Sequence, residues 1–160
     1  MRSVKTTERN VAEDRFVSQH LAGPSLKPSS HLHMITAHDL QDLRNAIAGG
    51  KLPPDLETKL TQLSLGDLGR RFIGQNCLTM IALLLAAQEG SFKAACQGEC
   101  ERLLQVLAYV RKDDDGIPDY RPDGFTDDQR EVRAITTEFG PLIQEFKGWR
   151  LCHQVPRMWS

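Results

Sequence analysis

This chain of 160 residues lacks any long apolar run and any excess of charge of one sign. Its basic and acidic residues number 20 and 21, whereas a dedicated nucleic-acid binder concentrates basic charge on one face. The longest nearly uncharged run, Phe72 to Gln88, contains the polar amides Gln75 and Asn76 and falls short of the roughly 20 apolar residues that span a bilayer. Residues 1–20 contain no apolar stretch typical of a secretory signal. We therefore expect a cytoplasmic protein with no transmembrane segment and no nucleic-acid partner.

Sustained alternation of apolar and polar residues is also missing, which argues against half-buried strands. Apolar residues instead recur at steps of three and four, as on one face of a helix. The sequence predicts an all-α protein, a small bundle of about five helices in a single domain over residues 34–150. Residues 1–33, with their Pro, Gly and Ser, are expected to form a flexible N-terminal arm, and residues 151–160 a C-terminal tail.

The first two expected helices have clear boundaries. Thr36 followed by Asp39 has the spacing of a capping box, and Gly49 with Gly50 marks a helix end. A second helix is expected to open at Pro53 and Pro54, because proline is tolerated in a first turn.

A third helix is predicted to start between Ser64 and Asp67 and to run to Glu89. Its second half is apolar nearly all round, which is typical of a central helix. The residues expected to face inward are Leu65, Leu68, Phe72, Ile73, Cys77, Met80, Ile81, Leu84 and Ala87.

A helical hairpin is predicted over residues 92–149, around a turn rich in Asp, Pro and Gly. Ser91 is expected to cap its first helix, and Thr126 with Gln129 to form a capping box for its second. Asp127 and Asp128 would occupy the first turn, where the helix dipole favours negative charge. The second helix should kink or divide at Gly140-Pro141. The apolar seams expected to pack together are Cys96, Cys100, Leu103, Leu107 and Val110 on one helix, and Val132, Ile135, Phe139, Leu142, Phe146 and Trp149 on the other.

The four cysteines do not have the spacing of a disulfide framework. Cys96 and Cys100 continue an apolar seam, so we expect them to be buried thiols. Together with Cys152 and His153 they have the ligand types of a Cys3His zinc site, but the close cysteine pair on a turn that is typical of such sites is missing.

The most informative stretch lies between the two hairpin helices. It reads Tyr109, then Asp-Gly-Ile-Pro-Asp at 115–119, then Pro122, then Gly-Phe-Thr-Asp-Asp at 124–128. This pattern resembles the signature of the YkvA-like domain, a widespread bacterial family of uncharacterised function. The resemblance covers about Leu103 to Ile135 and implies a fold element, a helical hairpin, without implying catalytic residues.

Turn chemistry alone explains much of this stretch. Prolines reduce the conformational freedom lost on folding, glycines permit turns, and aspartates bond to backbone N–H groups. Ile117 and Phe125 would attach the turn to the hairpin. The residues assigned to turn and caps are Gly116, Ile117, Pro118, Pro122, Gly124, Thr126, Asp127 and Asp128.

Calcium or magnesium binding is an alternative, because carboxylates alternate around a glycine as in calcium loops. The core at 113–119 resembles that of thrombospondin type-3 repeats, although no register completes an EF-hand loop. The expected ligands are Asp113, Asp115, Asp119 and Asp123. No other cofactor is expected.

A metal-dependent hydrolase is the second alternative, with Asp115, Asp119, Asp127 and Asp128 as carboxylates that could hold two magnesium ions. No nucleophilic triad or phosphate-binding glycine loop accompanies them. The sequence therefore favours a non-catalytic helical accessory or interaction module with a protein partner. The residues of the tail expected to contact that partner are Val155, Arg157, Met158 and Trp159.

Overall fold

The structure, a computed structural model, describes residues 35–112 and 124–153. Within these ranges the chain is all-helical, as the sequence predicted. The six helices are α1 (Ala37–Ala48), α2 (Pro54–Ser64), α3 (Leu68–Gln88), α4 (Gln97–Arg111), α5 (Thr126–Glu138) and α6 (Gly140–His153). Among these described helices, none combines the length and the apolar character needed to cross a membrane.

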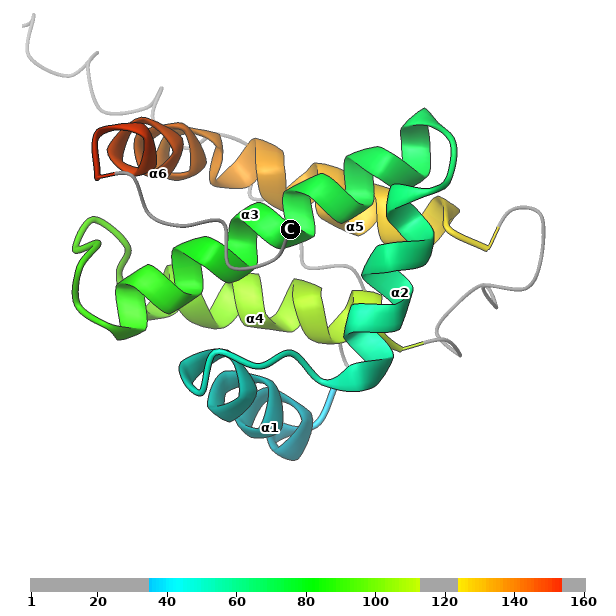
Figure 1. Cartoon of the computed structure of the whole chain (residues 1–160), viewed down its shortest axis with the longest axis horizontal. Coiled ribbons are helices and arrows are strands. Elements are labelled where there is room, and N and C mark those ends of the chain that lie inside the picture. The colour runs from blue at the N-terminus through cyan, green and yellow to red at the C-terminus, as the bar shows by residue number, and fades with distance from the viewer. Residues whose placement is uncertain (1–34, 113–123, 154–160) are drawn as a thin grey trace, which may run out of the picture.

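Helix α3 is the central element of the bundle. It runs through the middle of the molecule, with α1 and α4 on one side and α5 and α6 on the other (Figure 1). It contacts each of the other five helices. Ile73, Met80, Ile81 and Leu84 are fully buried along it, so a helix that is apolar nearly all round is here surrounded by partners.

Helix α1 has the predicted boundaries. Thr36 Oγ1 accepts a hydrogen bond from Asp39 N at 3.1 Å, and Asp39 Oδ2 accepts one from Thr36 N at 2.9 Å, which together form the capping box. Gly49 is the C-cap and Gly50 follows with a φ of 69°, in the left-handed region that favours glycine. The sequence therefore fixes both ends of this helix through local hydrogen bonds.

The prediction that Leu65 and Leu68 face inward was wrong, because both side chains are exposed, by 81% and 82%. Helix α3 begins only after Asp67, whose Oδ1 accepts a hydrogen bond from Arg70 N at 2.9 Å. Leu65 therefore lies in the turn that connects α2 to α3, and Leu68 is the first residue of α3, outside the part of the helix that is covered by its neighbours.

The predicted start of α4 was also wrong. The N-cap is Cys96, whose backbone N–H donates to Glu99 Oε2 at 2.8 Å, whereas the Ser91 hydroxyl donates to the carbonyl of Ala86 at the end of α3. Phe92 enters the core in place of Cys96, and its ring centroid lies 5.2 Å from that of Phe146. Cys96 itself is exposed at the start of the helix.

The predicted division near Gly140-Pro141 is present as two helices. Helix α5 ends at Glu138, α6 begins at Gly140, and Phe139 N donates to the carbonyl of Ile135 at 2.9 Å at the junction. Val132, Ile135, Leu142 and Phe146 are buried on the predicted seam.

Candidate functional site

A cluster of polar side chains is buried where α2, α4 and α5 meet. Lys59 is 3% exposed, Asp127 2%, Asp128 0% and Glu131 3%, and Tyr109 is 1% exposed. We call these five residues the buried polar cluster. Charged side chains are rarely buried to this extent unless they are paired. The hydrogen bonds and ion pairs of these residues therefore identify the candidate site in the described part of the chain.

Lys59 links three helices through one ammonium group. Its Nζ lies 3.1 Å from Asp128 Oδ2 in the first turn of α5, and it donates a hydrogen bond to the carbonyl oxygen of Lys112 at 3.1 Å. The ring of Phe125 lies 5.7 Å from the same Nζ, within range of a cation–π interaction. Lys112 directly precedes segment 113–123 and Asp128 closely follows it, so Lys59 connects the two sides of that segment.

A second contact joins α4 to α5 directly. The hydroxyl of Tyr109 donates to Asp127 Oδ2 at 3.0 Å, and both residues are buried. The two aspartates at the start of α5 therefore bond to different partners, Asp127 to α4 and Asp128 to α2. Their position in the first turn also places their negative charge beside the positive end of the helix dipole.

The end of α4 is fixed by two more ion pairs. Arg111 Nε lies 2.8 Å from Asp55 Oδ2 on α2, and Lys112 Nζ lies 3.2 Å from Asp39 Oδ2 on α1. Burial raises the pKa of Asp55, but hydrogen bonds from Arg111 and from the backbone of Leu56 outweigh it, and the pKa lies below its ordinary value. Helices α1 and α2 thus hold the end of α4 through these two ion pairs.

The thiol of Cys77 on α3 is influenced by the cluster, because the charges of Asp128 and Lys59 both affect its pKa. Burial, and then the negative charge of Asp128, raise the pKa of Cys77 to about 12, and the charge of Lys59 opposes this change. A thiol with so high a pKa is protonated at neutral pH and is a poor nucleophile.

Most residues that the sequence assigned to the acidic turn lie outside the described residues, as do all those assigned to the C-terminal tail. They are Asp113, Asp115, Gly116, Ile117, Pro118, Asp119, Pro122, Asp123, Val155, Arg157, Met158 and Trp159.

The remaining assigned turn residues are described, and they differ in role. Gly124 is buried just before α5, and Asp127 and Asp128 lie in its first turn as predicted. The predicted cap at Thr126 does not form: Phe125 is the N-cap, no side chain caps the helix, and Thr126 is exposed as its first residue. The backbone N–H of Gln129 donates to the carbonyl of Phe125 at 2.9 Å, so the helix begins one residue earlier than a cap at Thr126 would require.

The four cysteines are free thiols, and the described residues contain no group of three or more His, Cys, Asp or Glu that could hold a metal ion. Cys96 and Cys152 are exposed and Cys100 is half-buried. The expectation that Cys96 and Cys100 are both core thiols was therefore wrong for Cys96, and the Cys3His set of Cys96, Cys100, Cys152 and His153 is not assembled.

Sequence reasoning missed Lys59 and Glu131, although a signal for each was present. Lys59 lies at helical spacing between Leu56 and Leu63, on the face that α2 buries. Glu131 and Asp128 similarly continue the buried face of Val132 and Ile135. A charged residue in an apolar register of this kind indicates a buried ion pair, and an acid on one helix matched by a base on another could have been proposed as partners.

Chemically, the cluster contains the residue types of many active sites, but its hydrogen bonds run between helices. An ammonium 3.1 Å from Asp128 would repel a divalent cation at the same carboxylate, so Lys59 competes directly with the metal that a two-metal hydrolase would need there. No family model, curated protein or solved structure matches this chain.

Proposed function

We propose that this protein is a non-catalytic helical interaction module that binds a protein partner through its exposed leucine side chains. The observation that carries the proposal is the exposure of three leucine side chains on the surface of the bundle. Leu65 is 81% exposed, and Leu68 and Leu151 are each 82% exposed. Two of them share one turn, and large apolar groups gathered on a surface are typical of binding sites.

The buried polar cluster supports the same function, because its residues are of types common in active sites but here form bonds between helices. Lys59, Tyr109, Asp127 and Asp128 hold α2, α4 and α5 together. The resemblance to the YkvA-like domain fits this role, since the Tyr and the Asp pair of that pattern correspond here to residues that bond between helices. The exposed thiols of Cys96 and Cys152 favour a reducing compartment, and we propose the cytoplasm.

Site-specific photo-crosslinking in cells that produce the protein tests the proposal. A benzophenone amino acid would replace Leu65, Leu68 or Leu151 in separate variants, and Thr58, which is exposed on α2, would serve as the matched control. We expect a discrete crosslinked product from at least one leucine position and none from Thr58. Absence of a position-dependent product at all three leucines would overturn the proposal.

The divalent-cation regulator is the second candidate, carried by Asp113, Asp115, Asp119 and Asp123, which lie outside the described residues. Thermal unfolding in EDTA, then in millimolar calcium and magnesium, distinguishes it. Ligand at a hundred times its Kd adds about 2.7 kcal/mol to the free energy of unfolding. A shift that Asp115→Asn abolishes would replace the first proposal with a metal-binding function.

A further inference from the structure

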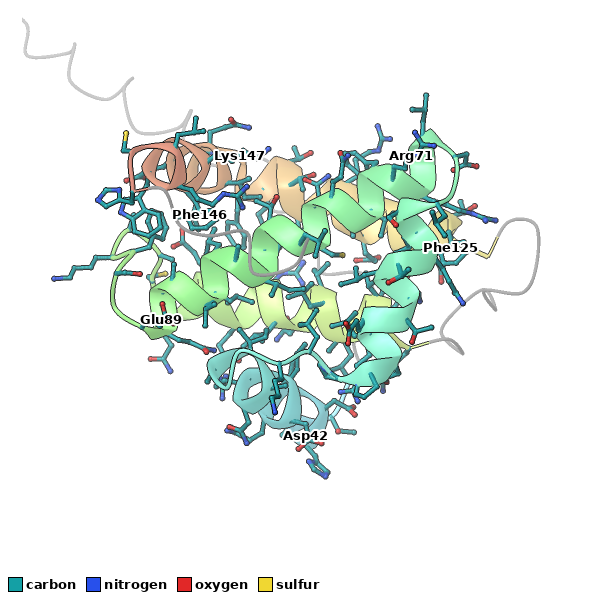
Figure 2. All side chains as sticks on the ribbon, viewed as in Figure 1. Asp42, Arg71, Glu89, Phe125, Phe146 and Lys147 are labelled. Carbon is teal, nitrogen blue, oxygen red and sulfur yellow. The ribbon has the colours of Figure 1, made fainter. Side chains whose placement is uncertain are left out.

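The turn between α2 and α3, the first turn of α3 and one residue of α5 form a surface with a distinct composition, which we call the leucine–arginine tip. It consists of Leu65, Leu68, Arg70 and Arg71, together with Arg133 from α5. Figure 2 shows Arg71 at the outer end of this turn, with Phe125 at the same end of the molecule. The two leucines contribute apolar surface and the three arginines contribute positive charge.

The arginines of the tip are held in place by uncharged groups. The guanidinium carbon of Arg70 lies 4.9 Å from the centre of the Phe125 ring, and that of Arg133 lies 5.2 Å from the centre of the Phe72 ring. Arg71 Nε donates to the carbonyl of Gly66 at 2.9 Å. Among the described residues, none of the three arginines forms an ion pair with a carboxylate.

One acidic side chain is part of the same turn. Asp67 Oδ1 accepts the backbone N–H of Arg70 at 2.9 Å as the N-cap of α3, so this carboxylate is already committed to the helix. The described tip therefore carries more positive than negative charge, beside two leucines that are more than four-fifths exposed.

Charge complementarity argues against two possible occupants of the tip. A second copy docked tip to tip would bring like charges together, which is unfavourable. Residues 154–160 contain Arg157 and no acidic residue, so this tail does not complement the tip either. An acidic partner with apolar side chains complements both components of the surface.

The placement of the guanidinium groups favours carboxylates over a lipid surface. A planar guanidinium that rests on an aromatic ring has few accessible orientations and presents its N–H groups in a fixed fork, the geometry that binds a carboxylate with two hydrogen bonds. Attraction to an anionic membrane depends on positive charge near the surface and needs no such orientation.

We propose that the leucine–arginine tip binds an acidic segment of a partner protein that also carries apolar side chains. This inference rests on the proposed function and specifies the partner's chemistry. The partner's apolar side chains contact Leu65 and Leu68, and its glutamates or aspartates bond to Arg70, Arg71 and Arg133.

Fluorescence anisotropy with the full chain and three designed helical peptides tests this assignment. The peptides share one set of leucines along a helical face and carry glutamate, glutamine or lysine at all other positions. We expect the glutamate peptide to bind roughly tenfold more tightly than the glutamine peptide, the size of effect that one or two charge pairs produce, and the lysine peptide to bind most weakly. Added salt should weaken the glutamate peptide most.

Two double variants and two matched controls locate the binding site. Leu65→Ser with Leu68→Ser, and Arg70→Gln with Arg133→Gln, should each weaken the glutamate peptide by about tenfold or more. Thr58→Ser alters a side chain that is exposed on α2 outside the tip, and Arg150→Gln removes an arginine that also lies over an aromatic ring, 5.9 Å from the centre of Phe146. These controls should bind like the unaltered protein, and circular dichroism should show that all variants are folded.

Equal binding of the three peptides, or equal losses in the controls, would overturn the assignment. A second contradicting outcome combines two results: the glutamate peptide does not bind, and the protein binds vesicles of phosphatidylglycerol and phosphatidylcholine in a way that requires Leu65 and Leu68. The occupant of the tip would then be a membrane. If a partner crosslinks through Leu151 and none of the three peptides binds, the proposed function is retained and only the assignment of the tip as its site is wrong. Failure of both experiments would remove both proposals.

Discussion

The ammonium of Lys59 on α2 lies 3.1 Å from the carboxylate of Asp128 on α5, and both side chains are buried. The same ammonium bonds to the carbonyl of Lys112, the residue that ends α4. One side chain therefore joins the helix before segment 113–123 to the helix after it. The pair connects parts of the chain that are distant in sequence, so it forms only when α2 packs against the hairpin.

Replacing Lys59 with methionine should destabilise the protein strongly. Methionine fills a similar volume but leaves Asp128 without the ammonium and the Lys112 carbonyl without this donor, and removing one partner of a buried pair costs about 3–5 kcal/mol. Urea unfolding followed by circular dichroism measures the change in the free energy of unfolding.

The double variant Lys59→Met with Asp128→Leu is the control for this prediction. Apolar replacement of a whole buried ion pair is often neutral or better, so the double variant should be more stable than Lys59→Met alone. The single variant Asp128→Leu completes the comparison. If the loss of unfolding free energy in the double variant equals the sum of the losses in the two single variants, the two side chains are not coupled in the folded protein.

Tyr109→Phe tests the second contact of the cluster. Only the hydroxyl that donates to Asp127 is removed, and loss of a hydrogen bond to a buried charged acceptor costs about 1.5–3 kcal/mol. Urea unfolding of Tyr109→Phe, Asp127→Ala and the double variant gives the coupling energy. A coupling energy near zero would contradict a direct bond between the two side chains.

Local signals in the sequence predicted the helices and several of their ends. The Thr36–Asp39 box and the glycines after α1 act within a few residues, and they could be read without knowledge of the fold. The boundary of α4 could not, because Phe92 packs against Phe146 and Trp149 from a distant helix and this contact outweighs the weak cap at Ser91.

The buried polar cluster was only partly predictable for the same reason. Asp127 and Asp128 could be placed in the first turn of α5, but their partners Tyr109 and Lys59 are set by tertiary packing. The exposed leucines were misassigned because Leu65 and Leu68 continue the apolar spacing of α3 at a position where no neighbouring helix covers them. A periodic pattern indicates a face of a helix, whereas its burial depends on what packs there.

Thiol labelling should separate the four cysteines by rate. Cys96 and Cys152 are exposed and should react with a maleimide at once in the native protein. Cys100 should react more slowly, because burial and then the neighbouring Cys96 raise its pKa above the ordinary value. Cys77, whose pKa burial raises to about 12, should react only on unfolding. Mass spectrometry of timed samples gives the order, and modification of Cys77 as fast as that of Cys152 would contradict the buried position of α3.

Helix α1 offers a prediction of stability against pH. Hydrogen bonds from the backbone and side chain of Thr36, with a contribution from Lys112, lower the pKa of Asp39 from 3.8 to about 2. A carboxyl group with a lowered pKa stabilises the folded state at any pH above its unfolded pKa, and this contribution disappears as the pH falls through the folded pKa. Loss of the cap in Asp39→Ala should cost about 1 kcal/mol at neutral pH.

The difference in the free energy of unfolding between the unaltered protein and Asp39→Ala should therefore stay constant above about pH 5 and shrink between pH 3.8 and pH 2. Asp42→Ala is the matched control, because Asp42 is exposed on the same helix and takes no part in the capping box. Chemical unfolding at a series of pH values measures both differences. A difference for Asp39→Ala that persists unchanged at pH 2 would show that the charge of Asp39 does not contribute, and that Thr36 caps α1 alone.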